Sequence, residues 1–162
     1  MRWSGYITRG PVLDVACGSG RHANYLARRG LEVVAVDRDA QVLEKSISFV
    51  KADLEAGAWP FGERRFAAIV VVNYLHRALL PVLARALDEG GVLVYETFMR
   101  GNERYGKPSN PDFLLQPGEL LRAFGELTVV AFEQGLVEGP KTAVIQRLCA
   151  LLGAAESARI AR

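Results

Sequence analysis

Apolar residues recur along this chain in short runs, and each run is followed by a glycine-rich or polar turn. Residues 12–16 and 31–36 are apolar runs of strand length. Between them, small and apolar residues repeat every three or four positions, which lines one face of a helix with groups that can lie flat on a sheet. The pattern predicts a strand over 12–16, a glycine turn over 17–20, a helix over 21–29 and a second strand over 31–36.

The same alternation continues toward the C-terminus. Residues 66–72 form a continuous apolar run, typical of a strand buried on both faces. Residues 99–116 are a long polar loop, and its place after a strand favours a lid over the substrate side. The remaining predictions are a helix after Asp39 with Val42 and Leu43 inward, strands at 47–50, 92–96, 127–132 and 142–148, and helices at 81–88 and 117–124. This order requires an open, mostly parallel α/β sheet with helices on both faces.

Two glycines lie at the centre of the first turn. Gly18 and Gly20 let the backbone turn sharply and let a ligand approach where a Cβ atom would clash. The turn leads into a helix whose first N–H groups and positive dipole end point at the same spot. Asp37 ends the neighbouring strand and can accept two hydrogen bonds from a ribose diol. Together these features predict a crevice that binds a nucleoside.

The residues around the turn are compatible with two cofactors. Residues 18–23, Gly-Ser-Gly-Arg-His-Ala, fit the G-x-G-x-x-G/A dinucleotide fingerprint, with Asp37 following at the expected interval. Residues 14–20, Asp-Val-Ala-Cys-Gly-Ser-Gly, resemble motif I of the class I S-adenosylmethionine-dependent methyltransferases, D/E-x-G-x-G-x-G. Ala16 replaces the first glycine of that motif, which narrows the approach without blocking it. Length favours the methyltransferase, because 162 residues leave no room for the second domain that a dehydrogenase usually adds.

The resemblance covers the chain from about Trp3 to about Leu151. It implies a Rossmann-like, doubly wound sheet of seven mostly parallel strands that ends in an antiparallel hairpin. Residues 17–23, with the later Leu-Gln-Pro-Gly-Glu-Leu at 115–120, are similar to the small tellurite-resistance-type bacterial methyltransferases. The family normally begins with helices that cap the cofactor, whereas residues 1–10 here are short, so the cap is expected to be reduced or missing. The expected domain is 1–152, followed by a flexible tail at 153–162.

The resemblance also implies the cofactor, S-adenosyl-L-methionine, which leaves as S-adenosyl-L-homocysteine. In the family the glycine loop packs against its methionine part, Asp37 holds the ribose, Asp53 accepts from the adenine amino group and Leu54 packs on the ring. For Asp53 an exposed loop carboxylate is the alternative. The implied cofactor contacts are Asp14, Ala16, Cys17, Gly18, Gly20, Arg21, His22, Asp37, Arg38, Asp53, Leu54, Asn73, Tyr74 and Leu75.

The chemistry narrows the catalytic candidates. The sulfonium carries its own leaving group, so the protein mainly orients the acceptor. A soft acceptor such as sulfur, selenium or tellurium ionises near neutrality and needs no strong base, whereas an alcohol or an amine needs one. The strand 66–72 is followed by the segment that the family places beside the methyl. The candidates are Tyr74, His76 and Glu96; the alternatives are a core tyrosine, a surface histidine and a carboxylate bonded to the long loop.

Composition excludes several function classes. The net charge is +2, with basic and acidic residues spread along the chain, so neither nucleic acid nor a membrane surface is implied as a partner. No apolar run reaches the length of a membrane span, and the N-terminus lacks the apolar region of a signal peptide. Cys17 and Cys149 form neither a disulfide framework nor a metal pattern, and small buried hydrophobes are expected. A cytosolic protein, with a homodimer left open, is the expectation.

The sequence therefore supports three hypotheses on the function of the protein. The leading one is a methyltransferase that acts on a small-molecule acceptor. The second is an NAD(P)-binding oxidoreductase or sensor, because the dinucleotide fingerprint is matched as well. The third is a non-catalytic module that binds the cofactor and acts through a partner, since the usual capping helices are not evident.

Overall fold

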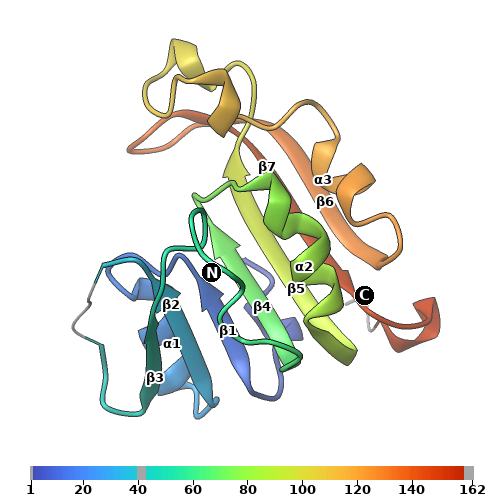
Figure 1. Cartoon of the computed structure of the whole chain (residues 1–162). Helices are drawn as coiled ribbons and strands as arrows, with labels where there is room; N and C mark the ends of the chain where they lie inside the picture. The colour runs from blue at the N-terminus through green and yellow to red at the C-terminus, as the bar shows by residue number, and fades with distance from the viewer. Residues whose placement is uncertain (1, 40–42, 159–162) are drawn as a thin grey trace.

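A single twisted sheet of seven strands organises the molecule (Figure 1). The computed structural model describes residues 2–39 and 43–158. The strands are β1 (Val12–Val15), β2 (Val33–Asp37), β3 (Ile47–Lys51), β4 (Phe66–Val72), β5 (Leu87–Phe98), β6 (Thr128–Val137) and β7 (Ala143–Leu151). The helices are α1 (Arg21–Arg28), α2 (Leu80–Arg85) and α3 (Glu119–Ala123), with 3-10 turns η1 (Ser4–Tyr6), η2 (Arg77–Leu79), η3 (Asn102–Arg104), η4 (Pro111–Phe113) and η5 (Ala155–Ser157).

The strand order is β3-β2-β1-β4-β5-β7-β6. The first five strands run parallel, and β7 pairs antiparallel with both β5 and β6. The chain moves outward from β1 to β3 and then returns to place β4 on the other side of β1. The strand order therefore reverses between β1 and β4, and in open α/β sheets ligands bind beside such a point. The predicted fold class is confirmed.

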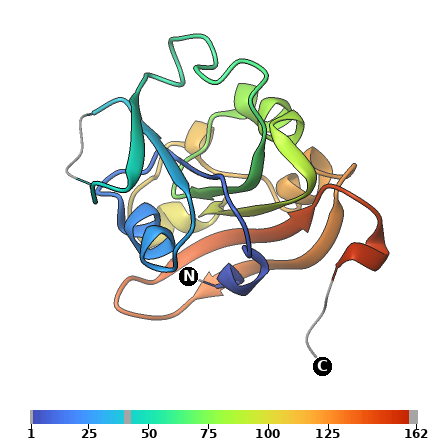
Figure 2. The ribbon, with the colours of Figure 1, turned by 90° about the horizontal axis from the view of Figure 1, so that it is seen from below.

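Helices cover the sheet on both faces (Figure 2). One face carries α1 and η1. Leu26 of α1, and Ile7 directly after η1, pack with the apolar side of β1, β2 and β4. The other face carries α2 and α3, where Leu83 and Phe124 join the larger apolar cluster. Every residue of β4 except its last, Val72, is buried, as its continuous apolar run predicts.

Two predicted elements have different bounds in the structure. The helix expected over 81–88 is shorter, because α2 ends at Arg85 and Leu87 begins β5 by pairing with Phe66. Residues 88–91 also belong to β5. Leu87 is buried and reaches the core from a strand.

The segments on either side of the sheet also differ from expectation. The helix predicted after Asp39 falls mainly on residues 40–42, including Val42, which lie outside the described residues, and 43–46 are not helical. Leu43 packs against the cluster on the α1 face, as predicted. The long loop contains η3 and η4, and a parallel bridge between Met99 and Leu115 anchors it to the sheet. Of the expected flexible tail, 155–157 form η5 and 159–162 lie outside the described residues.

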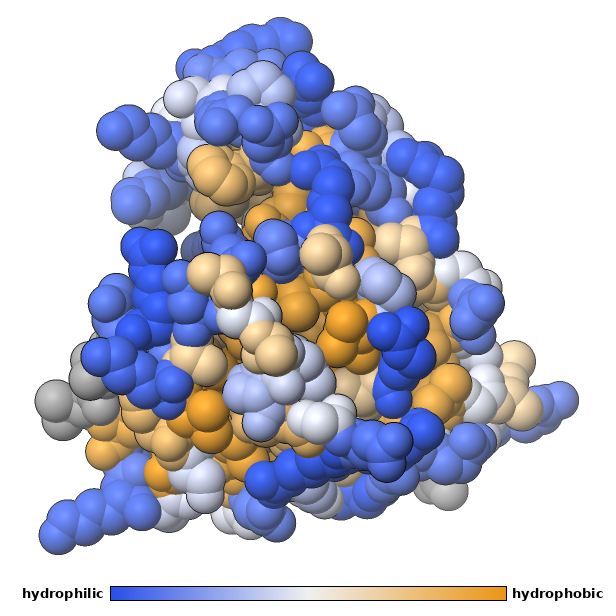
Figure 3. All heavy atoms as spheres, in the orientation of Figure 1, coloured by the Kyte–Doolittle hydropathy of each residue, from blue (hydrophilic) through white to orange (hydrophobic). Residues whose placement is uncertain are grey.

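On the face that carries α2, apolar side chains occupy the centre of the surface and polar ones frame it (Figure 3). Cys17 and Cys149 are both buried and free, as expected for small hydrophobes. Among the described helices, none has the length and apolar character needed to cross a bilayer.

Candidate active site

The glycine loop between β1 and α1 is held by a buried carboxylate. Asp14 is 2% exposed, and its Oδ2 accepts the N–H of Ala23, in the first turn of α1, at 2.8 Å. The Ala23 N–H is one of the helix N–H groups that the sequence predicts to point at a ligand, and Asp14 already accepts it. Burial, and then the neighbouring charge of Asp37, raise the pKa of Asp14 to about 7, although the Ala23 hydrogen bond opposes the rise. Asp14 thus positions the loop from beneath.

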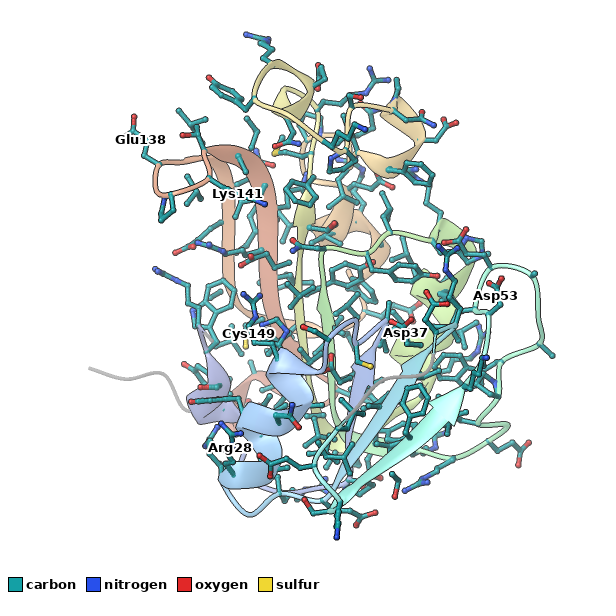
Figure 4. The ribbon with its side chains drawn as sticks, turned by 90° about the vertical axis from the view of Figure 1, so that its left-hand side faces the viewer. Arg28, Asp37, Asp53, Glu138, Lys141 and Cys149 are labelled. Carbon is teal, nitrogen blue, oxygen red and sulfur yellow. The ribbon has the colours of Figure 1, made fainter. Side chains whose placement is uncertain are left out.

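Asp37 lies beside the loop at the carboxyl end of β2. Its Oδ2 accepts the N–H of Gly18 at 2.8 Å, and its Oδ1 accepts the N–H of Asp39 at 3.1 Å. The predicted proximity of this carboxylate to the glycine turn is therefore present. Figure 4 shows Asp37, at the end of β2, and Asp53, in the loop after β3, on the same side of the molecule.

The loop backbone adopts conformations that explain its small residues. Gly18 and Gly20 have φ values of +52° and +72°, and Ala16, at the position of the motif's first glycine, has φ +51°. A Cβ atom on Gly18 would meet nothing within 4 Å, whereas one on Gly20 would come within 2.0 Å of the Leu43 side chain. The space above Gly18 is therefore open for a ligand, while Gly20 is required by packing.

A cavity of about 380 Å³ opens next to Asp37. We call it the acidic pocket, because three carboxylates and one guanidinium line it. Its remaining walls are apolar or aromatic. The lining residues are Ala16, Asp37, Arg38, Ala52, Asp53, Leu54, Glu55, Tyr74 and Phe113.

Tyr74 carries an unsatisfied polar atom in this pocket. Its hydroxyl is buried, and no described residue meets hydrogen-bond geometry with it, although the Glu55 carboxylate lies near enough to contribute to its pKa. Burial, followed by the negative charges of Glu55 and Asp53, raises the pKa of Tyr74 to about 12, so the hydroxyl stays protonated at neutral pH. A buried hydroxyl without a partner is unfavourable, and a bound molecule with a polar edge would satisfy it.

A second cavity, of about 360 Å³, lies on the α1 face beside the ends of β4 and β5. We call it the basic pocket, because three guanidinium groups and one carboxylate line it. Three aromatic residues, one histidine and two valines complete the wall. The lining residues are Arg2, Trp3, Arg21, His22, Tyr25, Val72, Val94, Tyr95, Glu96 and Arg147.

A row of charges crosses three strands at the edge of the basic pocket. Arg147 on β7 lies opposite Glu96 on β5 and opposite Glu133 on β6, and it forms ion pairs with both. Arg2 pairs with Glu133 at 2.6 Å and brings the N-terminal segment to the same row. Opposite charges directly across neighbouring strands stabilise the pairing, so Glu96 is engaged in the sheet.

His22 contributes a neutral ring to the basic pocket. Burial, followed by the positive charge of Arg21, lowers the pKa of His22, while Glu96 acts in the opposite direction. Arg21 Nη2 lies 3.3 Å from His22 Nε2, where the guanidinium donates to the ring nitrogen. The imidazole is therefore uncharged at neutral pH.

The structure brings together only part of the predicted site. The acidic pocket contains Ala16, Asp37, Arg38, Asp53, Leu54 and Tyr74, and the basic pocket contains Arg21, His22 and Glu96. The lining of neither pocket includes Asp14, Cys17, Gly18, Gly20, Asn73, Leu75 or His76.

The three catalytic candidates do not converge. Tyr74 lines the acidic pocket, Glu96 lines the basic pocket, and His76 lines neither. Glu96 bonds to Arg147 on a strand and not to the long loop, which corrects that expectation. Cys17 is held as a thiol, because burial and then Asp14 raise its pKa to about 12. Leu75 is a core residue.

Two residues at or near the acidic pocket, Phe113 and Arg77, were not among the predicted site residues. Phe113 reaches the acidic pocket from the long loop. An isolated aromatic residue in a polar segment is the sequence signal that indicates such a contact. Arg77 holds that loop in place: it bonds Glu119 through two nitrogens, at 2.7 and 3.1 Å, and donates to the carbonyls of Asp112 and Leu114. These bonds connect the end of the central strand to the loop that carries Phe113.

The strand order and the glycine turn define a Rossmann-like α/β protein, and comparisons with known proteins show what it is similar to. Residues 12–91 match the sequence model of a family described as a methyltransferase domain. An uncharacterized methyltransferase of Mycobacterium bovis is 36% identical over 108 residues, which are 59% of this chain and 54% of that protein. A demethylmenaquinone methyltransferase of Renibacterium salmoninarum is 35% identical over 99 residues, which are 54% of this chain and 40% of that protein. The chain thus spans about half the length of the curated relatives it matches.

Solved structures agree on the fold. TehB from Haemophilus influenzae superposes with a TM-score of 0.74 at 17% identity and covers 92% of this chain and 59% of TehB. A Burkholderia thailandensis 1,6-didemethyltoxoflavin N1-methyltransferase was solved with 1,6-didemethyltoxoflavin and S-adenosylhomocysteine bound. It superposes with a TM-score of 0.64 at 21% identity, over 93% of this chain and 74% of that protein. The chain thus resembles the class I S-adenosylmethionine-dependent methyltransferases in sequence over residues 12–91 and in its fold.

Proposed function

We propose that the protein binds S-adenosyl-L-methionine in the acidic pocket and transfers its methyl group in line to a small-molecule acceptor. The observation that carries this proposal is the charge of the pocket at the point where strand order reverses. Asp37, Asp53 and Glu55 face one guanidinium there. S-adenosylmethionine carries a positive sulfonium, and a cavity lined by carboxylates attracts such a cation.

The individual residues of the pocket fit an adenosine. The carboxylate of Asp37 can accept from both ribose hydroxyls, as its position at the end of β2 allows. The hydroxyl of Tyr74 has no partner among the described residues and would gain one from a polar ligand edge. Leu54 and Phe113 supply apolar surface for a flat base. These residues bind and orient the cofactor, which when bound supplies the electrophilic methyl group.

The same features argue against a dinucleotide. A pyrophosphate normally sits on the N-terminus of the helix after the glycine loop. Here the Asp14 carboxylate already accepts the Ala23 N–H in the first turn of α1. The carboxylates of the acidic pocket would also repel phosphate oxygens. A nucleoside without phosphates suits this site better.

The named relatives support a small acceptor by analogy. One is a methyltransferase for demethylmenaquinone, and another was solved with 1,6-didemethyltoxoflavin bound. Both names describe small organic molecules.

Calorimetry on the full chain tests the proposal. We expect S-adenosylhomocysteine to bind in preference to NAD(H) and NADP(H), and Asp37→Asn to weaken this binding by ~1.5–3 kcal/mol, which is the range for a hydrogen bond to a charged group. Asp39→Asn is the matched control, because it removes the same charge from a side chain that is 75% exposed and outside the pocket lining.

The possible results separate the three hypotheses. Binding of NAD(H) without binding of S-adenosylhomocysteine would replace the proposal with the oxidoreductase or sensor. Tight binding of S-adenosylhomocysteine, with no methyl transfer to any acceptor in a broad screen with radiolabelled cofactor, would favour the non-catalytic module. Equal losses from Asp37→Asn and Asp39→Asn would show that the acidic pocket is not the binding site.

A further inference from the structure

The basic pocket differs in charge from the pocket assigned to the cofactor. We propose that the basic pocket receives the methyl acceptor, and that this acceptor is a small, ring-shaped anion that has lost its proton before it binds. The inference rests on the proposed function and adds the chemical class of the acceptor. Its evidence is the position, charge, bonding and shape of the pocket.

Both pockets adjoin the glycine loop between β1 and α1. Arg21 and His22 of the basic pocket follow directly after the glycine loop, while Ala16 of the acidic pocket precedes it. Val72 and Tyr74, which line the basic and the acidic pocket respectively, flank one residue at the end of β4. A cofactor that crosses the loop from the acidic pocket therefore extends its far end toward the basic pocket.

Charge favours an anion in the basic pocket. Three guanidinium groups line it, those of Arg2, Arg21 and Arg147, against the single carboxylate of Glu96. Glu133 neutralises part of this charge from behind by pairing with Arg2 and Arg147. The remaining field is positive, and it contributes to holding the imidazole of His22 uncharged.

The two groups of this pocket that can accept a proton, the His22 imidazole and the Glu96 carboxylate, are already bonded. The Nε2 atom of His22 accepts from Arg21 at 3.3 Å, and the Glu96 carboxylate is held by Arg147. An acceptor that must lose a proton during the reaction would therefore find no free base among the described residues of the lining. An anion needs none: its lone pair forms the bond to the methyl carbon, the carbon–sulfur bond breaks, and that electron pair stays on sulfur. Anion and sulfonium become two neutral groups, and no proton moves.

Shape favours a flat ring. Trp3 from the N-terminal segment and Tyr25 from α1 supply aromatic wall, and Val72 and Val94 supply apolar floor. The Arg2 guanidinium lies 5.7 Å from the centre of the Trp3 ring, which orients that ring at the pocket. A volume of about 360 Å³ accommodates a single substituted ring.

Benzoate and benzamide form a matched pair of probes, because they share a shape and differ in charge. The chain has two histidines, so the imidazole proton signals in NMR give a local readout. His22 lines the basic pocket, and His76 lines neither pocket and serves as the internal reference. With saturating S-adenosylhomocysteine, we expect benzoate to shift the His22 signals and to bind at least about tenfold more tightly than benzamide, the effect of roughly one partly screened charge.

Arginine variants locate the source of this preference. Arg147→Gln should reduce the preference for benzoate over benzamide to about threefold or less while leaving S-adenosylhomocysteine affinity unchanged. Arg28→Gln is the control, because it removes the same charge from the last turn of α1, at the end away from Asp37 (Figure 4). If Arg147→Gln does not fold, Arg21→Gln replaces it, and the comparison of the two probes on the wild type still stands.

Each outcome decides the inference. Equal affinity for benzoate and benzamide, shifts confined to His76, or no binding of benzoate in the presence of S-adenosylhomocysteine would overturn it while leaving the proposed function intact. Failure of S-adenosylhomocysteine itself to bind would instead count against the proposed function. Ring-substituted thiophenols serve as acceptors that can be methylated. The pH midpoint of kcat/KM should follow the pKa of each thiophenol, whereas one midpoint shared by all of them would indicate a protein base.

Discussion

Arg77 is expected to hold the long loop against the end of the central strand, and its removal should therefore lower the stability of the protein. The guanidinium donates to both carboxylate oxygens of Glu119 at 2.7 and 3.1 Å. It also donates to the carbonyl of Asp112 at 2.6 Å and to that of Leu114 at 2.9 Å. Arg77→Ala removes all four bonds at once.

The expected loss follows from the exposure of the two side chains. The Arg77 side chain is 42% exposed and that of Glu119 is 16% exposed, so solvent screens the ion pair and it contributes at most ~1 kcal/mol. The two hydrogen bonds to carbonyls add roughly 0.5–1 kcal/mol each. The sum is about 2 kcal/mol, which for a chain of this length lowers Tm by about 4–8 °C.

Thermal and urea unfolding of matched variants measure this loss. Arg77→Lys keeps the charge but not the planar fork, so it should lose most of the same stability. Arg122→Ala is the control, since it removes a hydrogen bond to the Pro117 carbonyl in the same region, and about 0.5–1 kcal/mol is expected. Equal Tm values for Arg77→Ala and Arg122→Ala would refute the assignment.

The same ion pair predicts a response to acid. Burial would raise the pKa of Glu119, but the hydrogen bonds from Arg77 and from the Gln116 N–H outweigh it, and the pKa lies below its ordinary value of 4.5. The contribution of a carboxylate with a lowered pKa is present above 4.5 and is lost as pH falls through the folded value. Glu119→Gln should therefore lose less stability than the wild type between pH 5 and the acid transition.

Two further predictions concern the glycine loop. The pKa of Asp14 is about 7 in the folded protein, against an ordinary value of 3.8. Its contribution to the free energy of unfolding is therefore full below about pH 4 and declines as pH rises to about 7. Asp14→Asn should remove this slope from the pH dependence of urea unfolding. Gly20→Ala should cost about 1–2 kcal/mol for left-handed backbone plus displacement of Leu43, whereas Gly18→Ala, with nothing within 4 Å of the new Cβ, should show only the backbone part of about 1 kcal/mol. Equal Tm losses for the two glycine variants would contradict the contact with Leu43.

Local sequence features predicted the N-terminal half of the sheet well. The strand β1, the turn with Gly18 and Gly20, the helix α1 and the placement of Asp37 beside the turn all follow from residues within one stretch of about 25 positions. Hydrophobic periodicity and the restriction of left-handed backbone to small residues act over such short distances. The buried character of β4 likewise follows from its own seven residues.

The bounds of α2 and β5 were decided by pairing between strands. The segment 88–91 contains two glycines and two acidic residues and resembles a helix end. In the structure Leu87 pairs with Phe66, and this contact draws the segment into the sheet. A partner 21 positions away in the sequence outweighs a weak local preference.

What the sequence by itself determined is the fold class, the glycine turn and the carboxylate of Asp37 beside it, because each depends on short-range periodicity and backbone freedom. What only the tertiary structure decided is how the catalytic candidates divide between two pockets. Glu96 meets Arg147 because β7 lies next to β5 in an antiparallel register, and Arg77 meets Glu119 because the long loop folds back onto the end of β4. Strand neighbours and loop paths are set by packing of the whole core, and the charge of the basic pocket follows from them.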